Sequence, residues 1–378
     1  MQNKHLFSLL AFTMLASCTV GPDYERPQFY PDAEVAKNLK LEQAEASPVG
    51  QDWYKQFNDP ALNRLIERAW AASPNVRIAV HKLREARYGL LRSNVQSFPM
   101  LDINAGYNYD RSSRDIGFSI DRDYYQLGMD ASWELDIWGG NRRAAEASRA
   151  LFEAAGANLD NVRLVMAAEV ANNYISLRTA QEQLRVAREN LKLQQEIYQL
   201  VQQKYDVGLT DFIALNQAQY AVESTKTLIP QLESEIEAYK NAVAVLLGVL
   251  PDDLAGTLDN TADNLVRRRL SYNLKQLYRL RVDVIRNRPD VRLAEQNLIA
   301  QNAAVGEAVA NLYPDVSISG FVGWQSGKIA GLINGDHSTY SYAPALKLPF
   351  FHWNQLMNTV NEQKEVKEQY VLSYQNAV

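Results

Sequence analysis

Residues 125–143 read YQLGMDASWELDIWGGNRR, and this stretch contains the feature that decides the fold. From Tyr125 to Asp136, apolar and polar residues alternate. This period of two is typical of a β-strand with one apolar and one polar face, because successive side chains of a strand point to opposite sides. A helix-like pattern begins soon afterwards, at about Asn141. The stretch therefore predicts a two-faced strand that leads into a helix.

Further segments of the chain show the same alternation. These expected strands are 101–110, 316–324 and 340–350, of which the last two alternate less cleanly. Strands of about 9 to 12 residues have the length needed to cross a bilayer at a tilt. A soluble amphipathic sheet with its aromatic residues in a core would show the same pattern, and strand pattern alone favours neither. Four strands are too few to close a membrane barrel, for which about eight is the smallest usual number, so several chains would have to share one.

Two sets of residues on these strands are candidates for a role at a membrane. Aromatic residues lie near strand ends or on the apolar faces, as an interfacial girdle requires: Tyr107, Tyr109, Trp133 and Trp324. Acidic residues alternate with apolar ones: Asp102, Asp110, Asp130, Glu134 and Asp136. Carboxylates can also serve acid–base catalysis, but their alternation along strands favours the polar, acidic lumen of a barrel. Such a lumen would disfavour anions, although only weakly in a wide pore.

The chain contains an internal duplication with an offset of 215 residues. SPNVRIA at 73–79 corresponds to RPDVRLA at 288–294, and Pro99 corresponds to Pro314. Each copy begins with a helix-like stretch that a proline ends. These expected helices are 75–98 and 290–313. Two strands follow in each copy, so the repeat predicts the order helix, strand, strand.

Between the duplicated segments lies a helical hairpin, expected over 141–205 and 211–247. Apolar residues of the second arm follow coiled-coil spacing, and Pro230 there should remove one backbone hydrogen bond and favour a bend. The first arm carries two apolar series, so it should have neighbours on both sides, in a wall of helices or in a bundle. At 1.5 Å per residue the first arm would be about 100 Å long, far longer than a typical globular helix.

The amino terminus reads as a lipoprotein signal peptide. Lys4 precedes an apolar stretch at 6–15 that is too short to span a membrane as a helix. LASC at 15–18 resembles the bacterial lipobox and contains the only cysteine of the chain. We therefore expect cleavage between Ser17 and Cys18 and a covalent lipid on Cys18; an ordinary secretory signal with a chance cysteine is the alternative. Thr19 is not the aspartate that holds lipoproteins at the inner membrane in the enterobacterial sorting pattern, which favours delivery to the outer membrane.

The composition argues against several other classes of protein. The net charge of −5 gives no basic field for nucleic acid, and no uncharged apolar run approaches the roughly 20 residues of a spanning helix. One cysteine and four scattered histidines offer little for a metal site or a disulfide framework. We find no phosphate-binding loop, dinucleotide-binding motif or zinc-protease motif, so we expect no enzyme and no cofactor apart from the lipid.

Four groups of residues together resemble the outer membrane factor family, the TolC-like export channels, and specifically the lipoprotein branch of RND-type tripartite efflux systems. They are Cys18 with Pro22, Tyr24 and Pro27; Trp53, Phe57, Asp59, Pro60, Leu62, Leu65 and Ile66; WELDIWG at 133–139 followed by NRR at 141–143; and YDVGLTD at 205–211 followed by Leu215, Ala218 and Gln219. The resemblance covers almost the whole chain.

The resemblance implies an α+β membrane protein with a TolC-like fold. Homotrimers of such chains form one 12-stranded outer-membrane β-barrel, with four strands per chain, continued by a periplasmic α-helical coiled-coil barrel. Drugs or other small molecules pass through it without a chemical step, delivered by a periplasmic adaptor and an inner-membrane RND-type transporter. The family's hairpin turn meets the adaptor, which assigns that contact to Val207, Gly208, Leu209 and Thr210. Glycine at 208 permits positive φ and can end the long helix.

We expect five segments along the chain. They are a signal peptide at 1–17, a leader at 18–50, a first repeat at 51–248, an equatorial connector at 249–288 and an incomplete second repeat at 289–378. The repeat arithmetic places roughly 80 further residues, a second hairpin, beyond the second repeat. A chain without them would leave the helical wall incomplete. The family resemblance implies that the residues of the aperture gate belong to this second hairpin. Three alternative functions stay open: a type I protein-secretion duct, a periplasmic structural lipoprotein and, because of the missing hairpin, a nonfunctional fragment.

Overall fold

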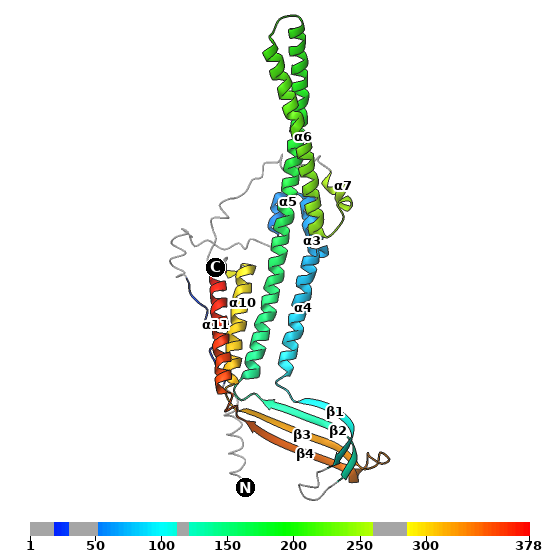
Figure 1. Cartoon of the computed structure of the whole chain (residues 1–378), viewed down its shortest axis with the longest axis vertical. Coiled ribbons are helices and arrows are strands. Elements are labelled where there is room, and N and C mark those ends of the chain that lie inside the picture. Colours follow the sequence, from blue (N-terminus) through cyan, green and yellow to red (C-terminus); the bar gives the residue numbers. More distant parts are fainter. Residues whose placement is uncertain (1–18, 30–51, 112–120, 260–285) are drawn as a thin grey trace. The chain divides into compact units, whose positions relative to one another are not determined.

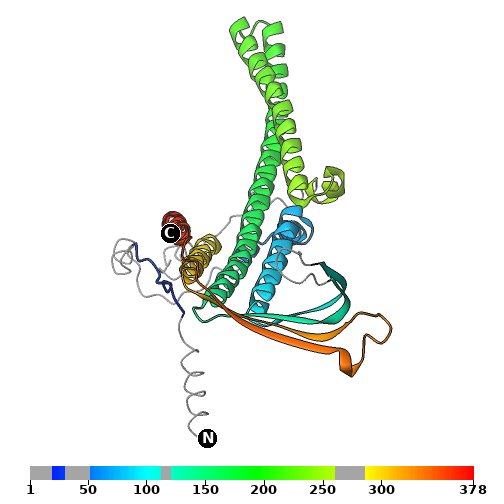
Figure 2. The ribbon, with the colours of Figure 1, turned by 60° about the horizontal axis from the view of Figure 1, so that its bottom comes forward.

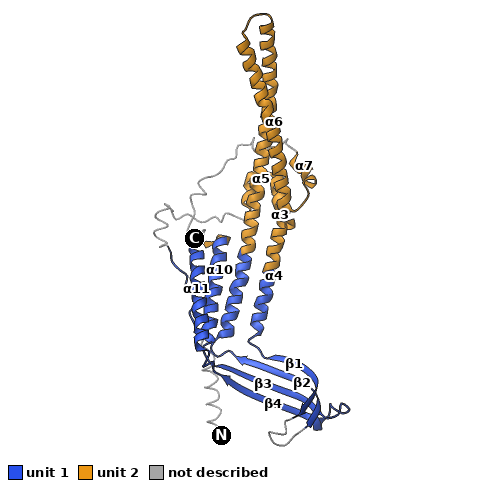
Figure 3. Cartoon of the chain, in the orientation of Figure 1, with its two compact units in different colours: residues 1–31, 83–157, 290–378 blue, residues 32–82, 158–289 orange. Residues whose placement is uncertain are grey.

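The computed structural model describes residues 19–29, 52–111, 121–259 and 286–378. The predicted cleavage and lipidation site at Ser17 and Cys18 lies outside these residues. The chain falls into two compact units (Figure 3). Unit 1 comprises residues 1–31, 83–157 and 290–378, and unit 2 comprises residues 32–82 and 158–289.

Unit 1 contains one antiparallel sheet of four strands in the order β1-β2-β3-β4 (Figure 1). The strands are β1 (Met100–Arg111), β2 (Asp121–Leu135), β3 (Asp315–Ser326) and β4 (Ser338–Lys347). The predicted fourth strand reached 350, but β4 ends at Lys347. Pro349 follows two residues later and has no N–H to donate to a ladder. All four predicted strands are confirmed. The two strands of each hairpin pair with each other, and β2 pairs with β3 to join the two hairpins.

The offset of 215 residues found in the sequence recurs in the structure. Helix α4 (Pro74–Val95) and helix α10 (Pro289–Ala310) have bounds that differ by this offset at both ends. The hairpin registers also match, because Met100 pairs with Ser132 and the residues 215 positions later, Asp315 and Lys347, pair with each other. Both helices end three residues earlier than predicted. The residues that follow form tight turns, with Phe98 N–H donating to the Val95 carbonyl and Tyr313 N–H to the Ala310 carbonyl.

Helices of unit 1 stand at one end of the sheet. In two views α10 lies between α11 (Trp353–Ala377) and the first part of α5 (Gly140–Asp206) (Figures 1 and 2). A Cβ added to Gly306 would lie 2.8 Å from Arg143 Nε, so α10 and α5 approach each other closely at this glycine. The side chain of Gln301 donates to the carbonyl oxygen of Gln363 on α11 over 3.1 Å. These contacts place α10 in the core of unit 1.

The predicted helical hairpin is formed by α5 and α6 (Phe212–Leu247). Helix α6 continues through Pro230. At the turn, Gly208 has a φ of 78°, which confirms the predicted positive φ. Leu209 N–H donates to the Lys204 carbonyl over 2.8 Å and Gly208 N–H to the Tyr205 carbonyl over 2.9 Å, the hydrogen-bond pattern of a Schellman C-cap. Asp211 then caps α6 by accepting from Ala214 N–H over 2.8 Å.

The core of unit 2 gathers short elements against the hairpin. These are η1 (Trp53–Phe57), α3 (Pro60–Ala72), η3 (Pro251–Leu254) and α7 (Ala255–Leu258). Asp59 caps α3 through the N–H groups of Ala61 and Leu62, and its other oxygen accepts a 3.0 Å hydrogen bond from the Tyr174 hydroxyl. Arg178 lies over the Tyr174 ring and donates to the Leu258 carbonyl at the end of α7. This network joins α3, α5 and α7.

Among the described residues, no single helix combines the length and the apolar composition needed to cross a membrane. One bent pair, α6 with the segment Pro251–Leu258, meets both criteria by length and composition alone.

Candidate functional site

The polar face of the sheet collects four of the five predicted acidic residues. Asp102 and Asp110 of β1 lie on the same face as Asp130 and Glu134 of β2, because Asp102 pairs with Asp130 and the others are an even number of residues away. Asn104 reinforces the arrangement by donating its side-chain N–H to Asp130. The face is therefore lined by carboxylates and amides.

Asp136 does not belong to this set, because β2 ends at Leu135. Its carboxylate instead accepts hydrogen bonds from the backbone N–H groups of Asn141 and Arg142, over 3.1 and 2.9 Å, at the start of α5. The Arg142 side chain pairs with the same carboxylate over 3.2 Å. A negative charge stabilises the positive end of a helix. Asp136 thus links the end of β2 to the start of α5, and this corrects its expected place on the strand.

The opposite face of the sheet is apolar and contains all four predicted girdle residues. Tyr107 packs against Tyr125 of the neighbouring strand, with 5.0 Å between ring centroids and 48° between the ring planes. Trp133, at the helix end of β2, donates its indole N–H to the Ser97 carbonyl over 3.1 Å. Many of the other apolar side chains are exposed in the single chain, with Ile103 77% and Tyr340 80% exposed. An apolar sheet face of this extent marks a surface that contacts lipid or another protein.

Phe321 is an apolar aromatic residue on the polar face, which also includes Tyr124. It lies opposite Asp130 in the register, and its ring covers Gly128, where an added Cβ would overlap the ring and lie 2.7 Å from the Val322 carbonyl oxygen. Gly323 pairs directly with Gly128 and is equally crowded. The two glycines therefore make room for the phenyl ring among the carboxylates and amides of this face.

Residues 19–29, here called the strap, are held along α5 and α10. Val20 N–H donates to the Trp138 carbonyl over 3.0 Å, and Gly21 packs so closely on α10 that a Cβ there would lie 2.5 Å from Gly306 Cα. Arg143, only 4% exposed, pairs with Asp23 over 2.7 Å. Sequence reasoning quoted Arg143 within a motif but gave it no role.

The far end of the strap contacts α10 through a second charged group. Glu295 is buried and accepts hydrogen bonds from the Arg26 guanidinium over 2.6 Å and the Tyr24 hydroxyl over 3.3 Å. Burial and the neighbouring Glu295 carboxylate raise the pKa of Tyr24 well above its ordinary value. Asn302 donates to the Pro22 carbonyl over 2.9 Å. Three buried polar side chains, Arg143, Glu295 and Asn302, thus have partners on the strap.

The hairpin turn presents a small apolar surface. Val207 is 69% exposed and Leu209 76% exposed, on either side of Gly208, while Thr210 is half-buried. Phe212 and Ile213, which sequence reasoning did not single out, add to this surface at the start of α6. A Cβ at Gly208 would meet nothing within 4 Å, so the turn is open at this position.

Comparison with known families now identifies this architecture. The family described as outer membrane efflux protein matches residues 65–249 and 280–378. The chain belongs to the outer membrane efflux protein family. It is therefore an efflux channel protein of the outer membrane, and the predicted family resemblance is confirmed.

Relatives and solved structures agree with this assignment. The chain is 26% identical to the probable outer membrane lipoprotein SilC of Salmonella typhimurium, covering 99% of this chain and 79% of that protein. It is 27% identical to the probable efflux pump outer membrane protein TtgC of Pseudomonas putida, covering 99% and 78%. The structure of the outer-membrane channel OprN matches with a TM-score of 0.82 at 32% identity, covering 95% of this chain and 79% of that one. CmeC of Campylobacter jejuni, with a TM-score of 0.76 at 22% identity, shares the fold. The predicted TolC-like fold is confirmed.

Proposed function

We propose that this chain is the outer-membrane channel of a tripartite efflux pump and conducts drugs or other small molecules passively to the exterior. The observation that carries the proposal is the two-faced sheet, with carboxylates on one face and exposed aromatic and aliphatic side chains on the other. A sheet of this kind suits a wall between lipid and water. No chemical step is needed for conduction, so we assign no catalytic residue.

The pore requires a homotrimer. Strands β1 and β4 are the edges of the sheet, and each presents unpaired backbone N–H and C=O groups. Three copies joined edge to edge would give a 12-stranded barrel, which leaves no open edge in the membrane. Its polar face, with Asp102, Asp110, Asp130 and Glu134, would line the lumen. Tyr107, Tyr109, Trp133 and Trp324 would meet the lipid interface.

The hairpin turn is the proposed adaptor contact. Val207, Gly208, Leu209 and Thr210 lie together at the end of the hairpin, and the exposed Val207 and Leu209 give an apolar surface for a partner. A periplasmic adaptor would bind there and link the channel to an inner-membrane RND-type transporter. That transporter would supply the energy.

We infer that the substrate is selected mainly by the inner-membrane partner. Relatives named for cation efflux, antibiotic efflux and solvent efflux match this chain at 26–27% identity. A wide lumen lined by carboxylates provides charge but no shaped binding site. We also propose that a covalent lipid on Cys18 anchors the chain in the membrane, because residues 15–18 resemble a lipobox.

Complementation of a channel-deleted bacterium tests the proposal. The chain would be expressed with its cognate adaptor and transporter, and accumulation of a fluorescent efflux substrate would be measured. We expect lower accumulation than in the vector control. Unchanged accumulation, with trimers present in the outer-membrane fraction, would refute the efflux function.

A further inference from the structure

Two junctions between helix and strand are clamped together within unit 1. Trp138, between β2 and α5, stacks on Tyr313, between α10 and β3, with 4.7 Å between ring centroids and 24° between planes. The Trp138 indole N–H donates to the Pro314 carbonyl over 2.9 Å. The contact joins the end of the first β-hairpin to the beginning of the second.

The offset of 215 residues generates an equivalent second set, in which phenylalanine replaces the tyrosine. It maps Trp138 onto Trp353 and the pair Tyr313 and Pro314 onto Phe98 and Pro99. Trp353 is 46% exposed and Phe98 66% exposed. Neither ring stacks on another ring among the described residues, and the Trp353 indole has no hydrogen-bond partner there. The residues of the second set are therefore present, but within one chain they do not make the stacking and hydrogen-bond contacts of the first set.

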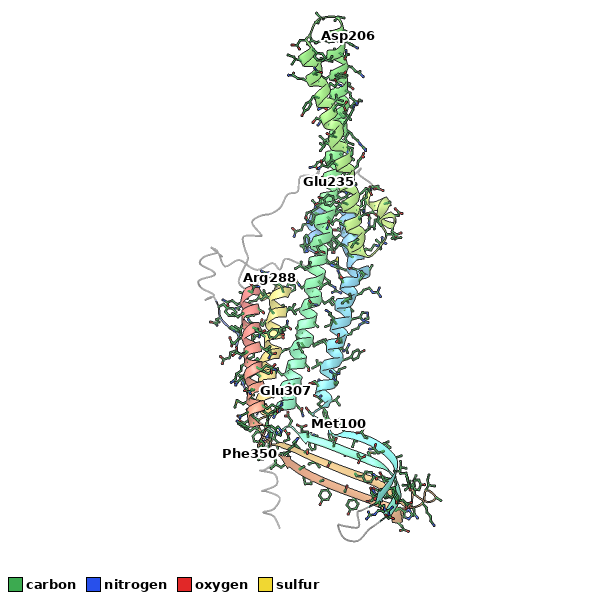
Figure 4. The ribbon with its side chains drawn as sticks, viewed as in Figure 1. Met100, Asp206, Glu235, Arg288, Glu307 and Phe350 are labelled. Carbon is green, nitrogen blue, oxygen red and sulfur yellow. The ribbon has the colours of Figure 1, made fainter. Side chains whose placement is uncertain are left out.

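The two halves of the second set lie at opposite edges of the sheet. Phe98 immediately precedes β1, and Trp353 follows β4, as the positions of Met100 and Phe350 show (Figure 4). A single chain cannot join two edges that are separated by the intervening strands. A second copy can, because its free β1 edge can pair with the free β4 edge of the first copy. Head-to-tail contacts close into a ring when the rotation between successive copies closes, as it would in the proposed trimer.

The strand register supports the same pairing. Within the chain Trp133 of β2 pairs with Ile318 of β3. When the offset carries the β2–β3 register to the outer edges, Tyr342 of β4 lies opposite Tyr109 of β1, and Pro344 lies opposite Tyr107. Both pairs lie on the apolar face, so pairing β4 with β1 in this register keeps the apolar and polar side chains on separate faces of the sheet. A register different by one residue would have mixed the two faces.

The second junction also lacks the support that the first one has. Asp136 caps α5, but the offset places Phe351 at the corresponding position, and Phe351 is 94% exposed. Helix α11 begins without a side-chain cap. The first junction is thus fixed by its own chain, whereas the second is left with exposed aromatic rings.

We propose that Trp353 of one copy stacks on Phe98 of the next copy and donates its indole N–H to the Pro99 carbonyl there. The contact repeats between copies the clamp that Trp138 makes within the chain, and it sets the β4–β1 register with Tyr342 opposite Tyr109. The inference rests on the proposed function, because it requires the trimer.

Cysteine cross-linking tests the contact in the full chain, in outer-membrane preparations. The pair Phe98→Cys and Trp353→Cys is treated with a short bifunctional thiol reagent, alongside each single variant. Phe98→Cys with Glu362→Cys, about 13 Å further along α11, is the matched control. Trp138→Cys with Tyr313→Cys is the reference that links within a chain. We expect covalent dimers and trimers from the first pair, at least tenfold more than from the control, and an unchanged subunit mass from the reference.

The outcomes separate this inference from the proposed function. Trimers on native gels without 98–353 cross-links, or with equal cross-linking of the control, overturn the contact and leave the proposed channel intact. Absence of trimers overturns both. Trp353→Phe adds a second measurement, because it keeps the ring but removes the N–H. We expect its trimer to dissociate at a temperature between those of the wild type and Trp353→Ala; a Trp353→Ala trimer as heat-resistant as the wild type contradicts the clamp.

Discussion

Asp102 of β1 lies directly opposite Asp130 of β2 on the polar face of the sheet. Like charges at directly opposed positions weaken an antiparallel pair, and cross-strand pairs are worth about 0.2–1 kcal/mol. The side-chain N–H of Asn104 offsets part of this repulsion at Asp130. The pair therefore lowers the stability of the β1–β2 pairing and places two carboxylates side by side on the polar face.

Asp102→Asn should remove the repulsion and one charge together. We expect the sheet to gain up to about 0.5 kcal/mol, and the channel to lose part of its preference for cations. Trimer melting and reversal potentials in planar bilayers measure the two effects. Asp110→Asn is the matched control: Asp110 lies opposite Arg122, so its loss should lower stability. An unchanged reversal potential in both variants would show that this face does not line the pore.

Gly128→Ala should damage the sheet where Gly106→Ala does not. An added methyl at Gly128 meets the Phe321 ring and the Val322 carbonyl, whereas nothing lies within 4 Å of a methyl at Gly106. We expect a cost of about 1–3 kcal/mol for the first and little or none for the second. Heat-modifiability on gels compares the two variants. Equal melting would mean that the phenyl ring can move aside freely.

Tyr174 should make unit 2 sensitive to alkali. Burial raises the pKa of Tyr174 from 10 to about 12. A raised pKa in the folded state means that its contribution is complete below pH 10 and is lost as the pH rises from 10 towards 12. Tyr174→Phe should cost about 1–3 kcal/mol at neutral pH, because Asp59 loses a hydrogen bond, and should flatten this decline. Urea unfolding between pH 8 and 12 measures both, with the exposed Tyr220→Phe as control; equal slopes in all three proteins would contradict the assignment.

Leu209→Ser should weaken adaptor binding without affecting the fold. The side chain is 76% exposed at the hairpin turn, so its replacement removes apolar contact area from a partner and little from the chain itself. We expect at least a tenfold loss of affinity for the purified adaptor by surface plasmon resonance. Leu193→Ser, an exposed leucine further along α5, is the control and should bind normally. Equal losses in both would place the contact along the helix rather than at the turn.

Arg143→Ala should release the strap. Arg143 is buried and donates to Asp23, Glu146 and the Val20 and Gly21 carbonyls. We expect a loss of about 1–3 kcal/mol and new protease cleavage within 19–29. Mass spectrometry after limited proteolysis detects the cleavage. The exposed Arg149→Ala should remain resistant, and resistance in Arg143→Ala as well would show that other contacts hold the strap.

Local patterns in the sequence were sufficient for the strands, the hairpin and the turn. Alternation determines which face a strand residue occupies, and glycine at 208 is suited to the positive φ that ends α5. Alternation also misplaced Asp136, because a capping aspartate after a strand continues the same period. The clamp of Arg143 and the network of Asp59, Tyr174 and Arg178 have no such signature. Their partners lie far apart in the chain, 115 residues apart for Asp59 and Tyr174, and only the folded structure brings them together.

The strap imposes an order on biogenesis. Arg26 is among the first described residues to leave the ribosome, but its partner Glu295 is synthesised 269 residues later. The contacts of the strap with α10 therefore cannot form until most of the chain has been exported. Because such distant contacts close late, Glu295 and Asn302 are satisfied after Arg143, whose partner Asp23 is only 120 residues away. Periplasmic chaperones would meet the chain before the strap has joined α10, and this contact would mark a subunit that is ready to assemble.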